Sequence, residues 1–535
     1  MARGLIAPRP AVAPSPAPNP AELHERKLAW MRSHPGGPVP TNVEWLRRLT
    51  PSEQAELGGG VRRKPTRTLS GVAIVAVMTA PSRCPHGQCT YCPGGVDLRS
   101  PQSYTGEEPS ALRGAQFGYD ARAITEHRLA TLEALGHPTS KVEAIVMGGT
   151  FPAQPATYQE SVFRGIYEGL NGAAAPSLAH AQWTNERAAR RLVSLTVETR
   201  PDWCDERVLP RLLDAGVTRV EIGVECLHDE VLVRVGRAHA SDDVRRATAA
   251  ARSRGLKVAY HWMLGLPGMD PERDLADFQR LFDELDYRPD MLKIYPTLVL
   301  PGTPLFDEWK RGEYTPYDTE TATALLARMK ALVPPWVRIQ RIQRDIPARL
   351  IAAGVRASNI RQLALERLRA GGGTCRCLRC REVGRRSTPA VDEFRLVERE
   401  YRAGGGLERF LSFEEPDTDT VGGFLRLRYS EESSDAAPPM PVVREVKVLG
   451  TEVAVGTSSV GSREVQHRGL GRALVGAAEA DAAQRGHDAV AVLSAVGSRA
   501  YFERLGYSRE GAYMVKRRFA GRNVSLSKEP VRGNP

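Results

Sequence analysis

The sequence of 535 residues lacks any run of eighteen apolar residues, which is about the length that a membrane-spanning helix requires. Its first ten residues, Met1 to Pro10, contain no apolar core of the kind found in a signal peptide. Cysteine is scarce, and six of the eight cysteines fall in two tight clusters, which excludes the disulfide framework of a secreted protein. We therefore expect a cytoplasmic protein in a reducing compartment, with no membrane partner.

Acidic residues are outnumbered by basic ones, and the net charge is +11. This excess favours a polyanionic partner, although charge alone does not identify one. The length predicts two or three domains. Residues 1–20 are rich in alanine and proline and predict a disordered tail. Residues 21–70 predict short helices and then a basic run, Arg62–Arg67, which is either an RNA phosphate contact or a solvated linker.

Three cysteines, Cys84, Cys89 and Cys92, stand within nine residues of one another after an apolar run. Three thiolates on a four-iron cluster leave one iron open to a small molecule, as S-adenosylmethionine (SAM) chemistry requires. The spacing favours a loop that wraps one [4Fe-4S] cluster. Zinc is one alternative, but it lacks a suitable fourth ligand nearby, because His86 falls inside the loop and structural zinc sites usually pair ligands from separated segments. An inert group of thiols is the other alternative.

Between residues 71 and 350, short β-rich runs alternate with longer amphipathic stretches. The expected strands are 71–78, 142–147, 192–197, 218–222, 257–262 and 291–295, and the expected helices are 121–135, 204–215, 242–254 and 272–285. This alternation predicts βαβ units whose parallel strands form a closed or partial (β/α) barrel. Barrels of this type carry their chemistry at the carboxyl ends of the strands.

The residues that follow these strands are candidates for cofactor binding. Gly148 and Gly149 allow the backbone to approach a ligand closely. Glu198 and Arg200 place a carboxylate and a guanidinium on one side of an extended segment, a pair that suits a zwitterionic amino acid. Glu225 follows the fourth strand, and the turn 261–268 offers an apolar face for adenine.

A second group of thiols, Cys375, Cys377 and Cys380, lies in a linker that we place at residues 351–390. Thiolates this close repel one another unless a metal neutralises them. We interpret the group as a zinc site, with Cys204, Cys226 or a histidine as the fourth ligand. Eight arginines between residues 361 and 386 predict an RNA-contacting surface beside it.

A different domain is expected over residues 391–520, followed by a tail, 521–535. Its expected strands are 394–401, 409–413, 423–428, 442–449 and 489–493. One helix is expected just before the domain, at 361–370, and one within it, at 466–485. Residues 431–437 are an expected disordered loop. The glycine-containing turn that opens helix 466–485 presents unpaired amides to an anion, because a helix amino terminus favours phosphate.

The four residues between Cys84 and Cys89, with Pro85-His86 and the trailing Pro93-Gly94-Gly95, resemble the catalytic subunit of Elongator and its single-chain bacterial and archaeal relatives. The resemblance extends from about Arg62 to Lys516. It implies an α/β protein in which a radical-SAM partial (β/α) barrel precedes a GNAT-type acetyltransferase domain. It also implies a [4Fe-4S] cluster, SAM, acetyl-CoA, the anticodon loop of tRNA as substrate, and a self-sufficient single chain.

The resemblance also assigns roles to individual residues. Lys293 and Tyr295 face the reaction chamber, and Tyr501 and Phe502 lie near the thioester. The residues implied to bind acetyl-CoA elsewhere are Lys141, Glu445, Val446, Lys447, Val448, Leu470, Gly471 and Arg472.

The combination resembles the tRNA uridine acetyltransferase, or carboxymethyluridine synthase, that acts at carbon 5 of the wobble uridine. A SAM-derived radical would take hydrogen from the acetyl methyl group, the carbon radical would add to the base, and thioester hydrolysis would leave a carboxymethyl group. Three alternatives remain open. They are a lysine acetyltransferase with a structural barrel and Glu445 as general base, a non-catalytic tRNA-binding module, and another radical-SAM tRNA modifier.

Overall fold

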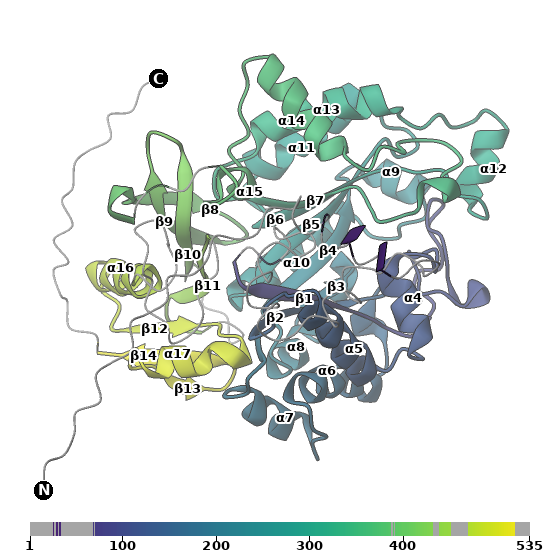
Figure 1. The fold of residues 1–535 in the computed structure, drawn as a ribbon. Helices are drawn as coiled ribbons and strands as arrows, with labels where there is room; N and C mark the ends of the chain where they lie inside the picture. The colour runs from purple at the N-terminus through teal and green to yellow at the C-terminus, as the bar shows by residue number, and fades with distance from the viewer. Residues whose placement is uncertain are drawn as a thin grey trace, which may run out of the picture.

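The computed structural model describes residues 70–386, 391–431, 438–450 and 469–518, together with 25, 28–29, 32–33, 68 and 389. The expected tails 1–20 and 521–535, the basic run 62–67, most of the loop 431–437 and the first residues of the helix expected at 466 lie outside the described residues. No helix in the described part combines the length and apolar character needed to cross a membrane. Two sheets organise the described chain (Figure 1).

The first sheet has seven parallel strands in the order of the sequence. They are β1 (Val72–Met78), β2 (Lys141–Met147), β3 (Arg191–Thr199), β4 (Arg219–Glu225), β5 (Lys257–Leu264), β6 (Met291–Pro296) and β7 (Arg338–Ile342). β1 and β7 are the two edges of the sheet, so the barrel is open between them. The six expected strands are confirmed, and several run two or three residues further than the pattern predicted.

Helices surround this sheet (Figure 1); most cover its outer face, whereas the first of them packs against the lumen-side residues Met78 and Met147. They are α4 (Pro109–Gln116), α5 (Ala121–Ala134), α6 (Ala156–Asn171), α7 (Leu178–Asn185), α8 (Leu209–Asp214), α9 (Asp229–Arg234), α10 (Ser241–Ser253), α11 (Pro271–Asp283), α12 (Pro304–Lys310) and α13 (Thr319–Leu332), followed by α14 (Ile360–Ala370) and α15 (Leu378–Arg381). The helix expected at 204–215 begins later, at Leu209. Pro210 has no amide N–H and is favoured in a first helical turn, which explains this start.

Side-chain alternation along the strands separates an apolar outer face from a polar lumen. On β2, Val142, Ala144 and Val146 are fully buried under the helices. The residues between them, among them Lys141 and Glu143, point into the lumen, as the period of two in a strand requires. The fold therefore directs charged side chains into the barrel without exposing its core.

The second sheet is mixed and has the order β13-β14-β12-β11-β10-β9-β8. Its strands are β8 (Arg395–Arg402), β9 (Gly406–Glu415), β10 (Thr420–Ser430), β11 (Val442–Val448), β12 (Ala489–Val492), β13 (Ser508–Glu510) and β14 (Tyr513–Arg517), with helices α16 (Leu470–Gln484) and α17 (Arg499–Glu503). The parallel partners β11 and β12 pair only at Val442–Ala491 and Val443–Val492. Beyond these pairs the two strands diverge, as in a GNAT-type acetyltransferase domain, and leave a gap beside the second half of β11.

Candidate active site

A cavity opens at the carboxyl ends of the barrel strands, and we call it the strand-end cavity. Its wall includes Cys84, Cys89 and Cys92 as well as the predicted residues Gly149, Glu198, Arg200, Glu225, Lys293 and Tyr295. Most of the residues predicted for SAM and for the reaction chamber thus share one cavity.

The three thiols of the cysteine loop line one wall of the strand-end cavity. Within the part of the chain that the structure describes, they do not form a group whose ligand atoms all lie within 4.8 Å of one another, as ligands of a single ion would. Thr150 contacts the Cys84 sulfur, Arg237 contacts that of Cys89, and Ser103 contacts that of Cys92. Hydrogen bonds of this kind to sulfur stabilise an iron–sulfur cluster, so the residues present fit a [4Fe-4S] group.

The glycine turn after β2 is closely packed against the cluster loop. A Cβ on Gly148 would lie 2.1 Å from the Thr79 Oγ1, and one on Gly149 would lie 3.5 Å from the Cys84 Sγ. Both glycines have positive φ, at 135° and 90°, which other residues rarely adopt. The turn therefore places bare backbone beside the sulfur of Cys84, as predicted for a ligand that approaches closely.

Glu198 and Arg200, the predicted pair, have different partners in the structure. Glu198 faces the cavity, where it accepts a hydrogen bond from the Tyr104 hydroxyl at 3.0 Å. Arg200 is buried, and its guanidinium donates to the Asp202 carboxylate and to the backbone carbonyls of Arg237 and Ala238. Arg200 thus holds the chain that follows β4, and its contact with a ligand carboxylate stays a prediction.

Glu225 ends β4 in an unusual backbone conformation. Its φ of 69° lies in the left-handed region, where a side chain costs of order 1 kcal/mol or more and which is common at functional sites. Its carboxylate is held 3.1 Å from the Arg237 guanidinium, which also contacts the sulfur of Cys89. Arg237 therefore connects the cysteine loop to the end of β4.

Lys293 lies at the centre of a buried charge network in the lumen. Its ammonium contacts Glu221 and lies 3.6 Å from Glu198, and His261 lies 3.4 Å from Glu221. Burial would lower the pKa of Lys293, but Glu221 outweighs it and raises that pKa. Burial would likewise raise the pKa of Glu221, but Lys293 and His261 lower it well below its usual range. The cavity floor therefore presents a fixed ammonium ion at neutral pH.

A second cavity of about 590 Å³ lies between the barrel and the second sheet, and we call it the interdomain cavity. Every residue predicted for acetyl-CoA lines it, namely Lys141, Glu445, Val446, Lys447, Val448, Leu470, Gly471, Arg472, Tyr501 and Phe502. Its other wall consists of residues at the starts of barrel strands, including Glu143, Arg219 and Lys257. The cavity thus joins the gap beside β11 to the end of the barrel opposite the strand-end cavity.

The start of α16 lines the interdomain cavity. Gly469 is its N-cap, with φ 84°, and makes no side-chain cap. The first amides of this fifteen-residue helix carry the positive end of its dipole. Gly471 lies in this first turn, where a Cβ would stand 3.1 Å from the Tyr501 hydroxyl. These features suit the pyrophosphate turn that was predicted here.

Charges cluster where the interdomain cavity meets the barrel. Burial would raise the pKa of Glu445, but Arg426, at 3.0 Å, and Lys257 lower it. Burial lowers the pKa of Lys257 to about 8, Glu445 opposes that shift, and Arg219 adds to it. Glu445 is therefore an ion-paired carboxylate rather than a poised general base.

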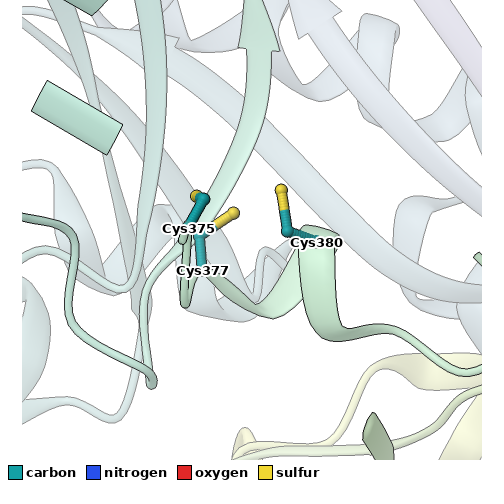
Figure 2. Close-up of side chains that lie close together, drawn as sticks. All are labelled: Cys375, Cys377 and Cys380. Atoms are coloured by element: carbon teal, nitrogen blue, oxygen red, sulfur yellow. The ribbon is translucent and has the colours of Figure 1, made fainter. Parts of the chain in front are cut away.

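The second cysteine group differs from the first in its geometry. The ligand atoms of Cys375, Cys377 and Cys380 all lie within 4.8 Å of one another, and Figure 2 shows Cys380 on α15 beside the other two. Such spacing suits a single ion. Neither Cys204 nor Cys226, nor any described histidine, belongs to this group, so the fourth ligand stays a prediction. The Lys330 ammonium donates to the Cys380 sulfur at 3.8 Å.

Three arginines of the linker form ion pairs with the second sheet, whereas Arg361 and Arg379 donate to carbonyls of β7. Arg381 is fully buried and contacts Glu414 and Asp419. Arg376 and Arg386 also approach Asp419. These ion pairs fasten the linker to β9 and β10, and the RNA-contacting surface predicted from arginine density remains without support from these contacts.

Several cavity residues were not predicted from the sequence. Tyr91, Tyr104 and Arg237 line the strand-end cavity, and Arg219 and Lys257 line the interdomain cavity. Arg219 and Lys257 stand at strand starts, whereas strand ends were expected to carry the site. A signal was present, because each of these basic residues begins a strand that is buried along almost its whole length.

Comparisons with known proteins agree with this arrangement. The Radical SAM superfamily matches residues 78–280, and the Radical_SAM C-terminal domain matches residues 289–370. The chain is 44% identical to the tRNA uridine(34) acetyltransferase of Methanocaldococcus jannaschii over 488 residues, 89% of this chain and 90% of the relative. It is 46% identical to the Dehalococcoides mccartyi protein of that name, covering 85% and 99% of the two chains.

A human relative and a solved structure extend the comparison. Elongator complex protein 3 of Homo sapiens is 41% identical over 494 residues, covering 89% of this chain and 90% of the relative. The structure of Methanocaldococcus infernus Elp3 with an N-terminal deletion aligns with a TM-score of 0.73 at 40% identity, covering 84% of this chain and all of that chain. With this identity over most of both chains, the protein belongs to the radical-SAM family of tRNA uridine(34) acetyltransferases and Elongator complex protein 3.

Proposed function

We propose that this protein is a tRNA uridine(34) acetyltransferase that uses SAM and acetyl-CoA to build a carboxymethyl group on carbon 5 of the wobble uridine. The observation that carries the proposal is the pair of cavities on one barrel. The strand-end cavity is lined by all three thiols of the cysteine loop. The interdomain cavity holds every residue expected to bind acetyl-CoA. Neither cavity alone accounts for a radical acyl transfer to a base.

Cys84, Cys89 and Cys92 would hold the [4Fe-4S] cluster, and Gly149 and Glu225 would contact SAM beside it. When bound, the reduced cluster supplies one electron to SAM and so provides the radical that activates the acetyl methyl group. Arg237, which contacts both Cys89 and Glu225, orients the cluster loop toward the SAM side of the cavity.

Lys293 and Tyr295 follow each other on the lumen face of β6 and would position the target base. The Lys293 ammonium stays charged because of Glu221 and suits a carbonyl oxygen of uracil. The Tyr295 ring lies at the cavity wall near the guanidinium of Arg344 and offers a face on which an unstacked base can rest. A base in this chamber has to leave the anticodon stack, as expected for chemistry on a nucleobase.

The main alternative, a lysine acetyltransferase with a structural barrel, depends on Glu445 as general base. A carboxylate whose pKa is lowered by Arg426 and Lys257 accepts a proton poorly at neutral pH. The same alternative assigns no task to a cavity with three cluster-type thiols. Tyr501, near the thioester end, is therefore proposed to orient acetyl-CoA and not to activate a lysine.

The test is an anaerobic reaction with reconstituted protein, dithionite, SAM, acetyl-CoA deuterated on its methyl group, and total tRNA. We expect deuterium in 5′-deoxyadenosine and carboxymethyluridine in the digested tRNA, both lost in Cys89→Ala. Hydrolysis of acetyl-CoA without either product would contradict the radical transfer and would favour a protein as the acetyl acceptor.

We also propose a structural zinc ion at Cys375, Cys377 and Cys380. The close approach of the three thiols supports this ion, because thiols this close to one another change one another's pKa values. Hydrogen bonds from Cys375 and Cys380 lower the pKa of Cys377 well below its ordinary value. A zinc ion would take the place of those shared protons. Its position between α14, β7 and the second sheet fits a role in fastening the linker.

A further inference from the structure

Lys257 is the first residue of β5, and its side chain lines the interdomain cavity. It is only 7% exposed. On the same face of this strand, His261 and Met263 line the strand-end cavity, as the period of two in a strand requires. The ammonium group of Lys257 is therefore held inside the protein, beside the space that is expected to bind acetyl-CoA.

Lys257 differs from the other buried lysines of the described chain in the partners of its ammonium group. Lys293 contacts Glu221, and Lys330 contacts the Cys380 sulfur. Among the residues that the structure describes, no hydrogen bond or salt bridge engages the Lys257 side chain. A buried charge without such a partner is costly, so burial favours the neutral amine, which is the nucleophilic form of lysine.

Two carboxylates of the same cavity attract the Lys257 ammonium, but each already has an arginine as its partner. Glu143 pairs with Arg219 at 2.5 Å. Glu445 pairs with Arg426 at 3.0 Å. Burial is the largest effect on Lys257 and lowers its pKa to about 8, although both carboxylates oppose that shift. Roughly a tenth of the Lys257 side chains are then neutral at pH 7, against less than about a thousandth for an exposed lysine.

Lys257 also stands beside the point where the gap between β11 and β12 begins. The turn that precedes β5 packs against this point. Arg444, the first residue of β11 beyond the paired region, donates a hydrogen bond to the Leu256 carbonyl at 3.0 Å. A Cβ on Gly255 would lie 3.4 Å from the Leu493 Cβ. The closed end of the gap and Lys257 are therefore neighbours.

The end of the cavity that is expected to bind the diphosphate of CoA lies further along β11. A Cβ on Gly471, in the first turn of α16, would lie 3.6 Å from the Val448 Cγ2, and Val448 ends β11. Val448 is four residues beyond Arg444, which at about 3.3 Å per residue is roughly 13 Å along the strand. A CoA whose diphosphate lies at the start of α16 thus has room to extend its pantetheine arm along β11 toward Lys257.

We propose that acetyl-CoA bound in the interdomain cavity acetylates Lys257, so that the protein modifies itself when the acetyl group is not consumed. The proposal rests on the proposed function only for the placement of acetyl-CoA in this cavity. The neutral Nζ attacks the carbonyl carbon of the thioester, and a carbon–nitrogen bond forms as the carbon–sulfur bond breaks. The proton that the nitrogen loses passes to the CoA sulfur, so the products are acetyl-lysine and CoA. No separate general base is needed, because the amine is neutral before the attack.

Acetylation of Lys257 closes the inner end of the interdomain cavity. The added acetyl group takes up space there, and the modification removes a positive charge that attracts Glu445 and Glu143. The modified protein therefore binds CoA and acetyl-CoA more weakly. Self-acetylation in this way lowers the consumption of acetyl-CoA when no tRNA is present to receive the acetyl carbon.

The test incubates the full-length protein with acetyl-CoA deuterated on its methyl group, without SAM, reductant or tRNA. Peptide mass spectrometry measures labelling at Lys257, at the half-buried cavity lysines Lys141 and Lys447, and at Lys310, which is exposed on α12. The concentration of acetyl-CoA is varied, and calorimetry measures the affinity for CoA before and after the reaction. Lys257→Arg removes the acceptor amine, and Lys310→Arg is the matched control.

We expect Lys257 to be labelled at least tenfold faster than the other three lysines, at a rate that saturates with acetyl-CoA and that excess CoA suppresses. Lys257→Arg should lose the fast labelling, and Lys310→Arg should keep it. The acetylated protein should bind CoA at least fivefold more weakly than the unmodified protein.

Binding of acetyl-CoA without fast labelling of Lys257 would overturn the self-acetylation. A labelling rate that rises linearly with acetyl-CoA would also overturn it, because a linear rate indicates encounters from solution rather than transfer from a bound molecule. The parent protein alone decides both outcomes, whether or not Lys257→Arg folds. Failure of the parent protein to bind CoA at all would instead overturn the proposed function, so the two failures are distinguishable.

Discussion

Arg444 of β11 donates two hydrogen bonds, of 2.8 and 2.7 Å, to the two carboxylate oxygens of Asp290, which stands just before β6. Both side chains are fully buried, and they join the second sheet to the barrel. Glu408 of β9 accepts from the same guanidinium and from that of Arg252 on α10. The boundary between the two domains is therefore a closed ion-pair network.

This network holds the two domains in one arrangement. A rotation of the second sheet away from the barrel would separate Asp290 from Arg444 and Glu408 from Arg252, and breaking a buried ion pair is strongly unfavourable. The network therefore opposes any movement of the second sheet away from the barrel wall of the interdomain cavity.

Asp290→Asn should destabilise the protein by about 3–5 kcal/mol, because Glu408 alone is then left to balance the buried guanidinium groups of Arg444 and Arg252. The loss should depend on pH. Burial would raise the pKa of Asp290, but Arg252, Arg444 and Arg426 lower it well below its ordinary value. The Asp290 carboxylate therefore stabilises the protein fully above about pH 4, which is the pKa of an aspartate in the unfolded chain. This stabilisation is lost as the pH falls toward the lower pKa of Asp290 in the folded protein.

Thermal denaturation of the parent protein and the variant between pH 3 and pH 7 checks this. The gap in melting temperature should be widest at neutral pH and narrow below about pH 4. Asp307→Asn, at an exposed carboxylate on α12 that pairs with Lys310, should shift the melting temperature little at any pH. An equal effect of the two substitutions would contradict the closed network.

Gly148→Ala should abolish productive SAM cleavage and destabilise the protein by roughly 1–3 kcal/mol. Its Cβ would stand 2.1 Å from the Thr79 Oγ1, at a φ of 135° that alanine does not tolerate. Deoxyadenosine formation and thermal denaturation measure the two effects. Gly476→Ala, in α16 with open space around the added methyl, should gain up to about 1 kcal/mol and retain activity.

The barrel strands were predictable because buried parallel strands are apolar runs of regular spacing. The cysteine loop and the glycine turn were predictable from local sequence as well. Arg219 and Lys257 were not, since their role depends on the second sheet packing against the strand starts, which no local pattern specifies. The helix expected from residue 204 likewise began at Leu209 because of Pro210.

The spacing of residues in the sequence also does not show which side chains approach one another in the folded protein. The two cysteine groups look alike as motifs, yet only the second places its sulfurs within 4.8 Å of one another. Arg200 looked available beside Glu198, but its donors are taken by Asp202 and two carbonyls. The orientation of the side chains in the folded protein decides both cases.

The two cysteine groups should lose their metals independently. Cys377→Ser should remove about one equivalent of zinc and leave iron unchanged, whereas Cys89→Ala should remove iron and leave zinc unchanged. Elemental analysis of anaerobically purified protein measures both metals in one sample. Parallel loss of iron and zinc in Cys377→Ser would indicate that the second group belongs to the folding of the whole barrel rather than to a separate ion.

Lys257 should be the most reactive lysine toward acetic anhydride near pH 7, because burial lowers its pKa to about 8. An ordinary lysine has a pKa near 10.4, so the neutral fraction of Lys257 is on the order of a hundred times larger. Lys257 lines the interdomain cavity, where bound CoA should protect it. Lys310, exposed on α12, is the internal reference. Peptide mass spectrometry after a limiting dose of deuterated anhydride gives the ratio of labelling at Lys257 to labelling at Lys310. Equal labelling of the two lysines would contradict the low pKa of Lys257. Labelling of Lys257 that CoA does not reduce would contradict the placement of acetyl-CoA against the barrel.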